Sequence, residues 1–174
     1  MSNLPASETP YSLLYPDVEQ EFATARRILE RVPDDKNDWR PHEKSMALDA
    51  LASHVAQLPG LAVMILTTKE FDRAAGPPLQ AKPANNAERL KLFDEVSGKA
   101  LGLLKGLTWD TAMIPWTFRF GERVVASGPR AKLLRSMVIT HMAHHRAQLG
   151  VYLRLLGVPI PGSYGPSADE PLPR

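Results

Sequence analysis

The amino-acid sequence predicts an all-α protein, a four-helix bundle with a small β-hairpin before the last helix. Over four long stretches, apolar residues recur at spacings of three and four, the period of a helix with one buried face. Most of the 16 prolines lie between these stretches or near the C-terminus, where proline disturbs a helix least. One short stretch, Trp116–Val125, instead combines aromatic and β-branched residues around a glycine, as a hairpin does.

The first helix is expected to begin at Pro16 and to end before Pro33. Its buried face repeats at helical spacing through Val18, Phe22, Ala25, Leu29 and Val32. The second helix is expected to start at Ser45, its N-cap, and to reach Thr68. Pro59-Gly60 should either kink this second helix or interrupt it.

The third helix follows the longest expected loop, Lys69–Ala84, which is rich in Gly, Pro and Ala. Asn85 and Glu88 have the spacing of a capping box, so this helix should run from Asn85 to about Gly106.

The hairpin and the last helix complete the chain. Residues 116–120 and 123–125 are the expected strands, joined by the turn Gly121-Glu122. Ser127-Gly128-Pro129 then begins the fourth helix, which ends at Leu156 because a glycine and a proline follow. One domain is expected over residues 1–174, with an irregular lead at 1–14 and a proline-rich tail at 158–174.

Composition excludes several classes of protein. The chain has no cysteine, which excludes disulfides, thiolate ligands and a catalytic thiol of its own. Its net charge is only +2, and Lys and Arg are spread along the chain, so no nucleic-acid partner is expected. Neither a signal peptide nor an uncharged apolar run long enough to span a membrane is expected. The predicted location is therefore the cytoplasm, without a membrane partner.

The segment Ile139–Gln148 holds three of the five histidines. His141 and His145 are four residues apart, so they stack on one face of the fourth helix. On an inward face their ring nitrogens need partners, and a divalent metal can satisfy one nitrogen of each ring. Two histidines bonded to backbone or water fit the same spacing, so the pattern alone leaves both interpretations open.

His54 is the candidate for a third ligand. It lies beside the apolar stripe of the second helix, and a bundle can bring the second and fourth helices face to face. A lone histidine in such a place also fits a structural role. His144 could instead pair with His141 at three-residue spacing, although it points away from the stripe of His141. His42 follows Pro41 in a connection, where it fits a turn or a cap.

Five short segments spread along the chain form a specific combination. They are Asp38-Trp-Arg-Pro41, Leu51-Ala-Ser-His54, His141-Met-Ala-His-His145-Arg-Ala-Gln148, Tyr152-Leu-Arg-Leu-Leu-Gly157 and Tyr164-Gly-Pro-Ser-Ala-Asp-Glu170. Together they resemble the DinB/YfiT-like family over roughly Pro16 to Glu170, and the fourth-helix motif is the most specific part. The resemblance implies an up-down-down-up bundle, commonly a homodimer. It also implies a divalent metal held by His54, His141 and His145, with His144 outside the ligand set.

Three neutral imidazoles would leave a coordination position open, as catalytic metal sites do. Zinc or nickel suits an all-imidazole set best, and iron or manganese less well. Similar proteins are described as metal-dependent hydrolases, or as S-transferases and isomerases that use low-molecular-weight thiols. The expected function is therefore a metal-dependent enzyme, a hydrolase or a thiol-dependent S-transferase, that acts on a small molecule. The alternative is a non-enzymatic, stress-associated metal-binding or interaction protein.

Residues near the motif are assigned less sharply. Gln148, one turn beyond His145, could orient a ligand or a bound water, or could be a buried amide bonded within the bundle. Arg146 points off the metal stripe and is expected in an ion pair or an interface. No general base is identified, because the carboxylates on the site-bearing elements are expected to be solvated: Asp49, Glu122, Asp169 and Glu170. The tryptophans are expected to pack in the core or a dimer interface: Trp39, Trp109 and Trp116.

Overall fold

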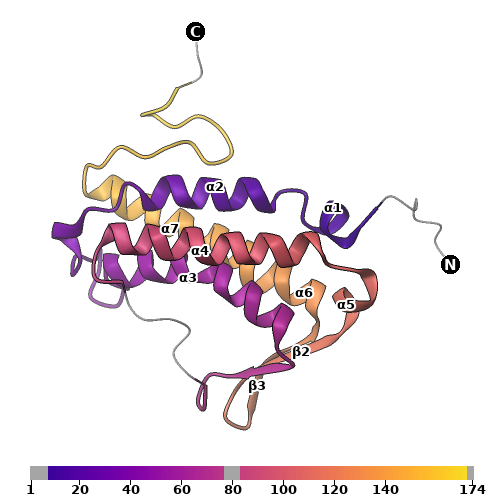
Figure 1. Ribbon diagram of the computed structural model, residues 1–174. Helices are drawn as coiled ribbons and strands as arrows, with labels where there is room; N and C mark the ends of the chain where they lie inside the picture. Colours follow the sequence, from indigo (N-terminus) through magenta and orange to yellow (C-terminus); the bar gives the residue numbers. More distant parts are fainter. Residues whose placement is uncertain (1–7, 77–82, 172–174) are drawn as a thin grey trace.

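The computed structural model describes residues 8–76 and 83–171, and its main feature is four long helical segments lying side by side (Figure 1). The first three are α2 (Val18–Leu29), α3 (Leu48–Thr67) and α4 (Asn86–Lys105). The fourth is a rod made of α6 (Arg130–Leu133), the π-helical segment η2 (Leu134–Thr140) and α7 (His141–Leu155). The short helices are α1 (Pro10–Leu14), η1 (Asp34–Lys36) and α5 (Trp109–Met113).

The directions of the long helices follow from the contacts between their ends. In chain order they run one way, the opposite way twice, and then the first way again (Figure 1). Arg135, early in the rod, bonds to Asp17 just before α2 (2.9 Å), so these two segments start at the same end. Arg89 and Asp49 pair near the starts of α4 and α3 (2.7 Å), so these two helices are also parallel. The apolar faces of all four meet in one core.

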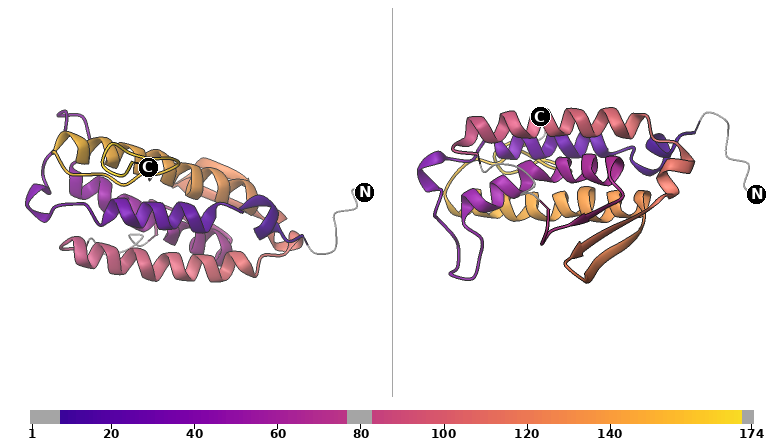
Figure 2. Two further views of the ribbon diagram at one scale, coloured as in Figure 1. Left: turned by 90° about the horizontal axis from the view of Figure 1, so that it is seen from above. Right: turned by 60° about the horizontal axis from the view of Figure 1, so that its bottom comes forward.

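Three strands correct the expected all-α class to a mainly helical fold with a small mixed sheet. The hairpin of β2 (Pro115–Phe120) and β3 (Arg123–Pro129) has the expected turn, with Gly121 at φ +59°. β1 (Glu70–Asp72) pairs in parallel with β2 and lies in the stretch expected to be a loop. The sheet projects from the bundle at the end where α3 stops and α6 begins (Figure 2).

The beginnings of the first two long helices differ from the expected ones. Thr9 and Ser12 form a capping box, so α1 occupies part of the lead that was expected to be irregular. α3 begins at Leu48 rather than after Ser45. The amide of Ser45 bonds to the carbonyl of His42 in a turn, and that of Leu48 bonds to the carbonyl of Trp39.

Packing keeps α3 continuous through its interior proline, and a side-chain cap sets the start of α4. Pro59 lies inside α3 and does not interrupt it, because the buried faces on both sides of the proline hold the helix in the core. Asn85 caps α4 as expected, by accepting from the amide of Glu88 at 2.9 Å. The Glu88 carboxylate accepts from the amide of Ala84, one residue earlier than a reciprocal capping box requires. Parts of the expected lead, loop and tail (1–7, 77–82 and 172–174) lie outside the described residues.

α3 is long and apolar enough to cross a membrane by length and composition, with a mean hydropathy of 1.5 over 18 residues. The expectation that the chain holds no such stretch is therefore wrong. In the structure 56% of that window is buried, and α3 packs between α4 and α7. The composition is that of a central helix in a helical core, which passes the same test.

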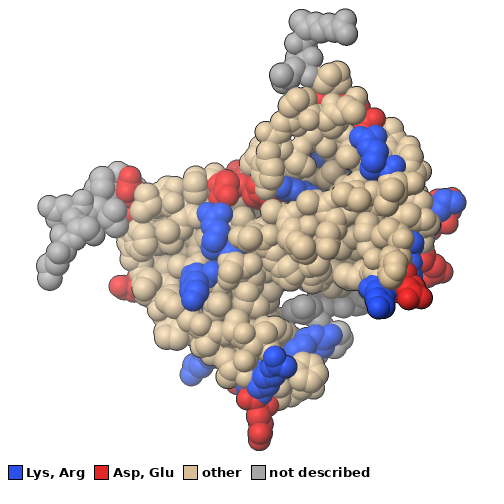
Figure 3. All heavy atoms as spheres, turned by 180° about the vertical axis from the view of Figure 1, so that it is seen from behind, with Lys and Arg blue, Asp and Glu red and all other residues tan. Residues whose placement is uncertain are grey.

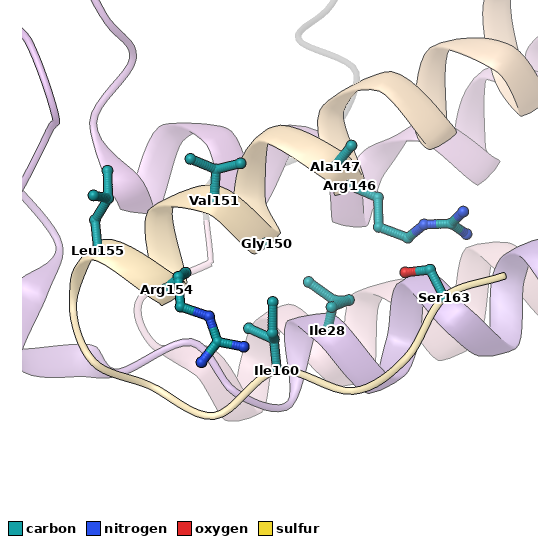
Figure 4. A pocket seen from close by; sticks show the side chains of 9 residues that line it. All are labelled: Ile28, Arg146, Ala147, Gly150, Val151, Arg154, Leu155, Ile160 and Ser163. Carbon is teal, nitrogen blue, oxygen red and sulfur yellow. The ribbon is translucent and has the colours of Figure 1, made fainter. Parts of the chain in front are cut away.

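The C-terminal segment lies along α2 and α7 (Figures 1 and 2). Asp169 bonds to Arg154 of α7 (2.5 Å) and accepts from the amide of Ile160 (2.9 Å), while Glu170 pairs with Arg27 of α2. These carboxylates were expected to be solvated, but they are the groups that fasten the segment to the bundle. Between α2, α7 and this segment lies a pocket of about 330 Å³, lined mainly by apolar side chains, with Arg146 and Arg154 also in its wall (Figure 4).

Candidate metal centre

Three histidine side chains from two helices converge at one point. His54 comes from α3, and His141 and His145 come from α7. One ring nitrogen of each lies within 4.8 Å of the other two. The Nε2 atoms of His54 and His141 are 3.4 Å apart, and those of His145 and His141 are 2.8 Å apart. All three rings are half-buried.

Two local features place these rings. His141 and His145 open α7 one turn apart, so their side chains lie one above the other. His54 sits between the buried residues Ser53 and Val55 on the part of α3 that packs against the rod. Because α3 and the rod are antiparallel neighbours, residues far apart in the chain meet at the same height.

Hydrogen bonds on the far side of two rings fix how those rings face the cluster. The Nδ1 atom of His145 donates to the Oε1 atom of Gln148 (2.7 Å), and that of His141 donates to the carbonyl of Met137 (3.2 Å). Carbonyl oxygens only accept, so in each ring Nδ1 carries the hydrogen and Nε2 keeps a lone pair. Both lone pairs are then directed into the cluster.

The donor set fits a divalent metal. Two Nε2 lone pairs 2.8 Å apart repel each other unless a proton or a cation lies between them. Metal–imidazole bonds of about 2.0–2.1 Å put neighbouring ligand nitrogens roughly 2.8–3.4 Å apart for angles of about 90–110°. The separations of 2.8 and 3.4 Å lie at the two ends of that range. Among the described residues, no carboxylate joins the three histidines as a fourth ligand.

The surroundings of His54 and His145 favour the neutral form of these two rings, which is the form that binds metals. Burial, together with the neighbouring His145 and His141 rings, lowers the pKa of His54 to about 4. Burial also lowers the pKa of His145. The hydrogen bond to Gln148 raises that pKa, but by less than burial lowers it. Both shifts have the same main cause, the loss of water around the ring.

The remaining residues singled out in the sequence have other roles. His144 is exposed and lies outside the cluster, with its ring 4.7 Å from that of His145. His42 accepts from the amide of Lys44 (3.2 Å), as a turn residue does. Gln148 is exposed, so the buried-amide alternative is wrong, and its contact is with the His145 ring.

Arg146 forms the ion pair that was expected as one of two alternatives. It is buried and bonds to Glu21 of α2 at 2.8 Å, on the side of α7 that faces the C-terminal segment. The hydroxyl of Tyr164 donates to the same carboxylate (3.1 Å), and the Tyr164 ring lies 4.9 Å from the guanidinium. This arrangement ties the C-terminal segment to both helices.

Asp49 corrects another expectation, since it is buried rather than solvated. Its carboxylate bonds to Arg89 of α4 (2.7 Å), whose Nη1 also donates to Asn86 (2.7 Å). The sequence gives no sign that Arg89 is buried, because an arginine on an amphipathic helix normally reaches water. Of the other carboxylates, Glu122 is exposed in the hairpin turn as expected.

Two of the three tryptophans, Trp116 and Trp39, have different surroundings. Trp116 is fully buried, and its indole N–H donates to Thr68 at the end of α3 (3.0 Å). Trp39 meets Tyr152 of α7 edge to face, with ring centroids 5.5 Å apart. Tyr152 lies one turn beyond Gln148 on the same face of α7, so this aromatic pair continues the histidine stripe along the helix.

Surface charge gives no sign of a phosphate-binding track on the face seen in Figure 3. There, Lys and Arg side chains stand singly or in small groups among Asp and Glu, separated by broad uncharged areas.

Comparisons with known proteins agree with the helical arrangement. A DinB-like protein from Bacillus cereus has a similar structure, with a TM-score of 0.67, 18% identity, and coverage of 87% of this chain and 95% of its own. The DinB-like protein YjoA from Bacillus subtilis is also similar, with a TM-score of 0.60, 15% identity, and coverage of 92% and 99%. No curated protein matches. The model of the DinB family matches residues 5–172, and the chain therefore belongs to the DinB family.

Proposed function

We propose that this chain is a metal-dependent enzyme that acts on a small molecule, as a hydrolase or as a thiol-dependent S-transferase. His54, His141 and His145 would hold the metal. The observation that supports this most directly is the orientation of the rings. Two of them have their Nδ1 sides bonded to oxygen acceptors, so their Nε2 lone pairs point at each other across 2.8 Å.

The exposure of the three histidine rings favours an enzyme over a non-enzymatic metal-binding protein. All three histidines are half-buried, and within the described part of the chain they have no fourth protein ligand, so a small molecule can approach the cluster. A divalent metal, zinc or nickel before iron or manganese, would supply Lewis acidity that lowers the pKa of a water or thiol. The chain contains no cysteine, so the thiol of an S-transferase reaction must come with the cosubstrate.

Metal content tests the site. The wild-type protein, loaded with zinc or nickel and freed of excess by gel filtration, should contain one metal per chain by elemental analysis. His141→Ala should contain little. His144→Ala is the matched control, since it removes a neighbouring exposed histidine and should keep full stoichiometry. Equal metal content in wild type and His141→Ala would reject the assignment.

Two activity screens separate the reaction classes. Thiol transfer would be followed with chlorodinitrobenzene or monobromobimane and several low-molecular-weight thiols, and hydrolysis with activated esters. Turnover in one screen that disappears in His141→Ala and persists in His144→Ala would identify the class. Full metal loading without turnover in either screen would instead support a non-enzymatic metal-binding protein.

A further inference from the structure

The helix that carries two of the histidines is not α-helical immediately before them. The segment η2 (Leu134–Thr140) is π-helical, and it ends at the residue before His141. π-helical turns are rare and are often found at functional sites. In the sequence, Leu134–Thr140 has the same apolar spacing as the rest of the rod and gives no sign of the change.

The π-helical turn changes which group bonds to the carbonyl of Met137. In an α-helix, each amide bonds to the carbonyl four residues earlier, so the His141 amide would bond to Met137. Where the π-helical segment ends, the His141 amide bonds instead to the carbonyl of Val138, only three residues earlier, which is a tighter turn than an α-helical one. The carbonyl of Met137 accepts from the Nδ1 atom of the His141 ring instead, at 3.2 Å.

We propose that η2 orients the ring of His141, and that it does so through the main-chain carbonyl of Met137. The inference rests on the proposed metal site and deepens it. The bond holds Nδ1–H in place and keeps the Nε2 lone pair directed at His54 and His145, 3.4 and 2.8 Å away. His145 obtains the same support from the side chain of Gln148, so the two ligands on α7 are oriented by different means.

Deletion of Ser136 tests the proposal, because removing one residue from a π-helical turn returns it to α-helical geometry without rotating the helix on either side. Ser136 is exposed, and its hydroxyl bonds only within the rod, to the carbonyl of Lys132 (3.0 Å). The His141 amide should then bond to the Met137 carbonyl and compete with the ring for it, which should weaken the bond to Nδ1. Loss of such a ligand contact typically weakens metal binding by about 10–100-fold, which is the expected change in the zinc Kd by chelator competition.

Two length-preserving variants are the matched controls. Ser136→Ala removes the hydroxyl and keeps the π-helical turn, and Met137→Leu changes the side chain and keeps the carbonyl. Both should bind zinc as the wild type does. An unchanged zinc Kd in a folded Ser136 deletion variant would overturn the proposal, and so would a zinc Kd raised as much by Ser136→Ala as by the deletion.

A second measurement distinguishes a loss of orientation of the His141 ring from general damage to the fold. In the zinc-loaded wild type, nuclear magnetic resonance should show slow exchange with water for the Nδ1 proton of His141. In the deletion variant this proton should exchange faster, while that of His145, held by Gln148, should not change. If the deletion variant does not fold, fast exchange of the His141 proton in the wild type would itself reject the proposal. A wild type that binds no zinc would instead reject the metal site.

Discussion

Removing one partner of the buried ion pair between Arg146 and Glu21 should strongly destabilise the fold. The two side chains are only 2% and 5% exposed, and their charged atoms are 2.8 Å apart. Glu21→Gln keeps the shape of the side chain but leaves the arginine buried without a counter-charge. Breaking a buried pair in this way costs about 3–5 kcal/mol. For a chain of this length, that lowers the melting temperature by about 6–20 °C.

The measurement is chemical and thermal denaturation of Glu21→Gln beside a matched exposed pair. Lys99 and Glu95 lie 2.6 Å apart on α4 with 60% and 55% of their side chains exposed, so Glu95→Gln should cost less than about 1 kcal/mol. The double variant Glu21→Gln with Arg146→Met should be more stable than Glu21→Gln alone, because no buried charge remains. Equal destabilisation by the two carboxylate variants would refute this reasoning.

Three further predictions concern the site and the C-terminal segment. Gln148→Leu should weaken zinc binding about 10–100-fold by chelator competition, because the His145 ring loses its acceptor, and an unchanged Kd would contradict this. The folded-state pKa of His54, about 4, lies below its ordinary value of 6.5, so the neutral ring contributes full stability above pH 6.5. That contribution is lost as the pH falls toward 4, so the metal-free melting temperature should drop across this window, and less so in His54→Gln. Gly162→Ala should loosen the C-terminal segment, because an added Cβ would lie 2.2 Å from the carbonyl oxygen of Gly165. Limited proteolysis should then cut this segment faster than in the wild type.

Much of the helical fold could be predicted because its signals are local. Apolar periodicity, the Asn85 cap and the glycines at positions 121 and 157 act within one or two turns of chain, and the structure places helix, cap and positive φ angles there. The predictions that were wrong share a different cause, which is contact between distant parts of the chain. β1 forms because Glu70–Asp72 finds β2, more than forty residues away, and an isolated three-residue strand has no signal of its own.

The candidate site also has features that follow from local sequence and features that depend on tertiary packing. The sequence by itself determined that His141 and His145 share one helix face, because the helical repeat fixes residues four apart. The family resemblance implied that His54 joins them, and the tertiary structure brings its ring there. Only the tertiary structure decided that Met137 and Gln148 orient the rings and that Asp49 is buried with Arg89. These outcomes depend on which groups share the same water-poor interior, where an unpaired polar group is costly. The packing of whole helices decides which polar groups become partners in this interior, and a short stretch of sequence does not predict it.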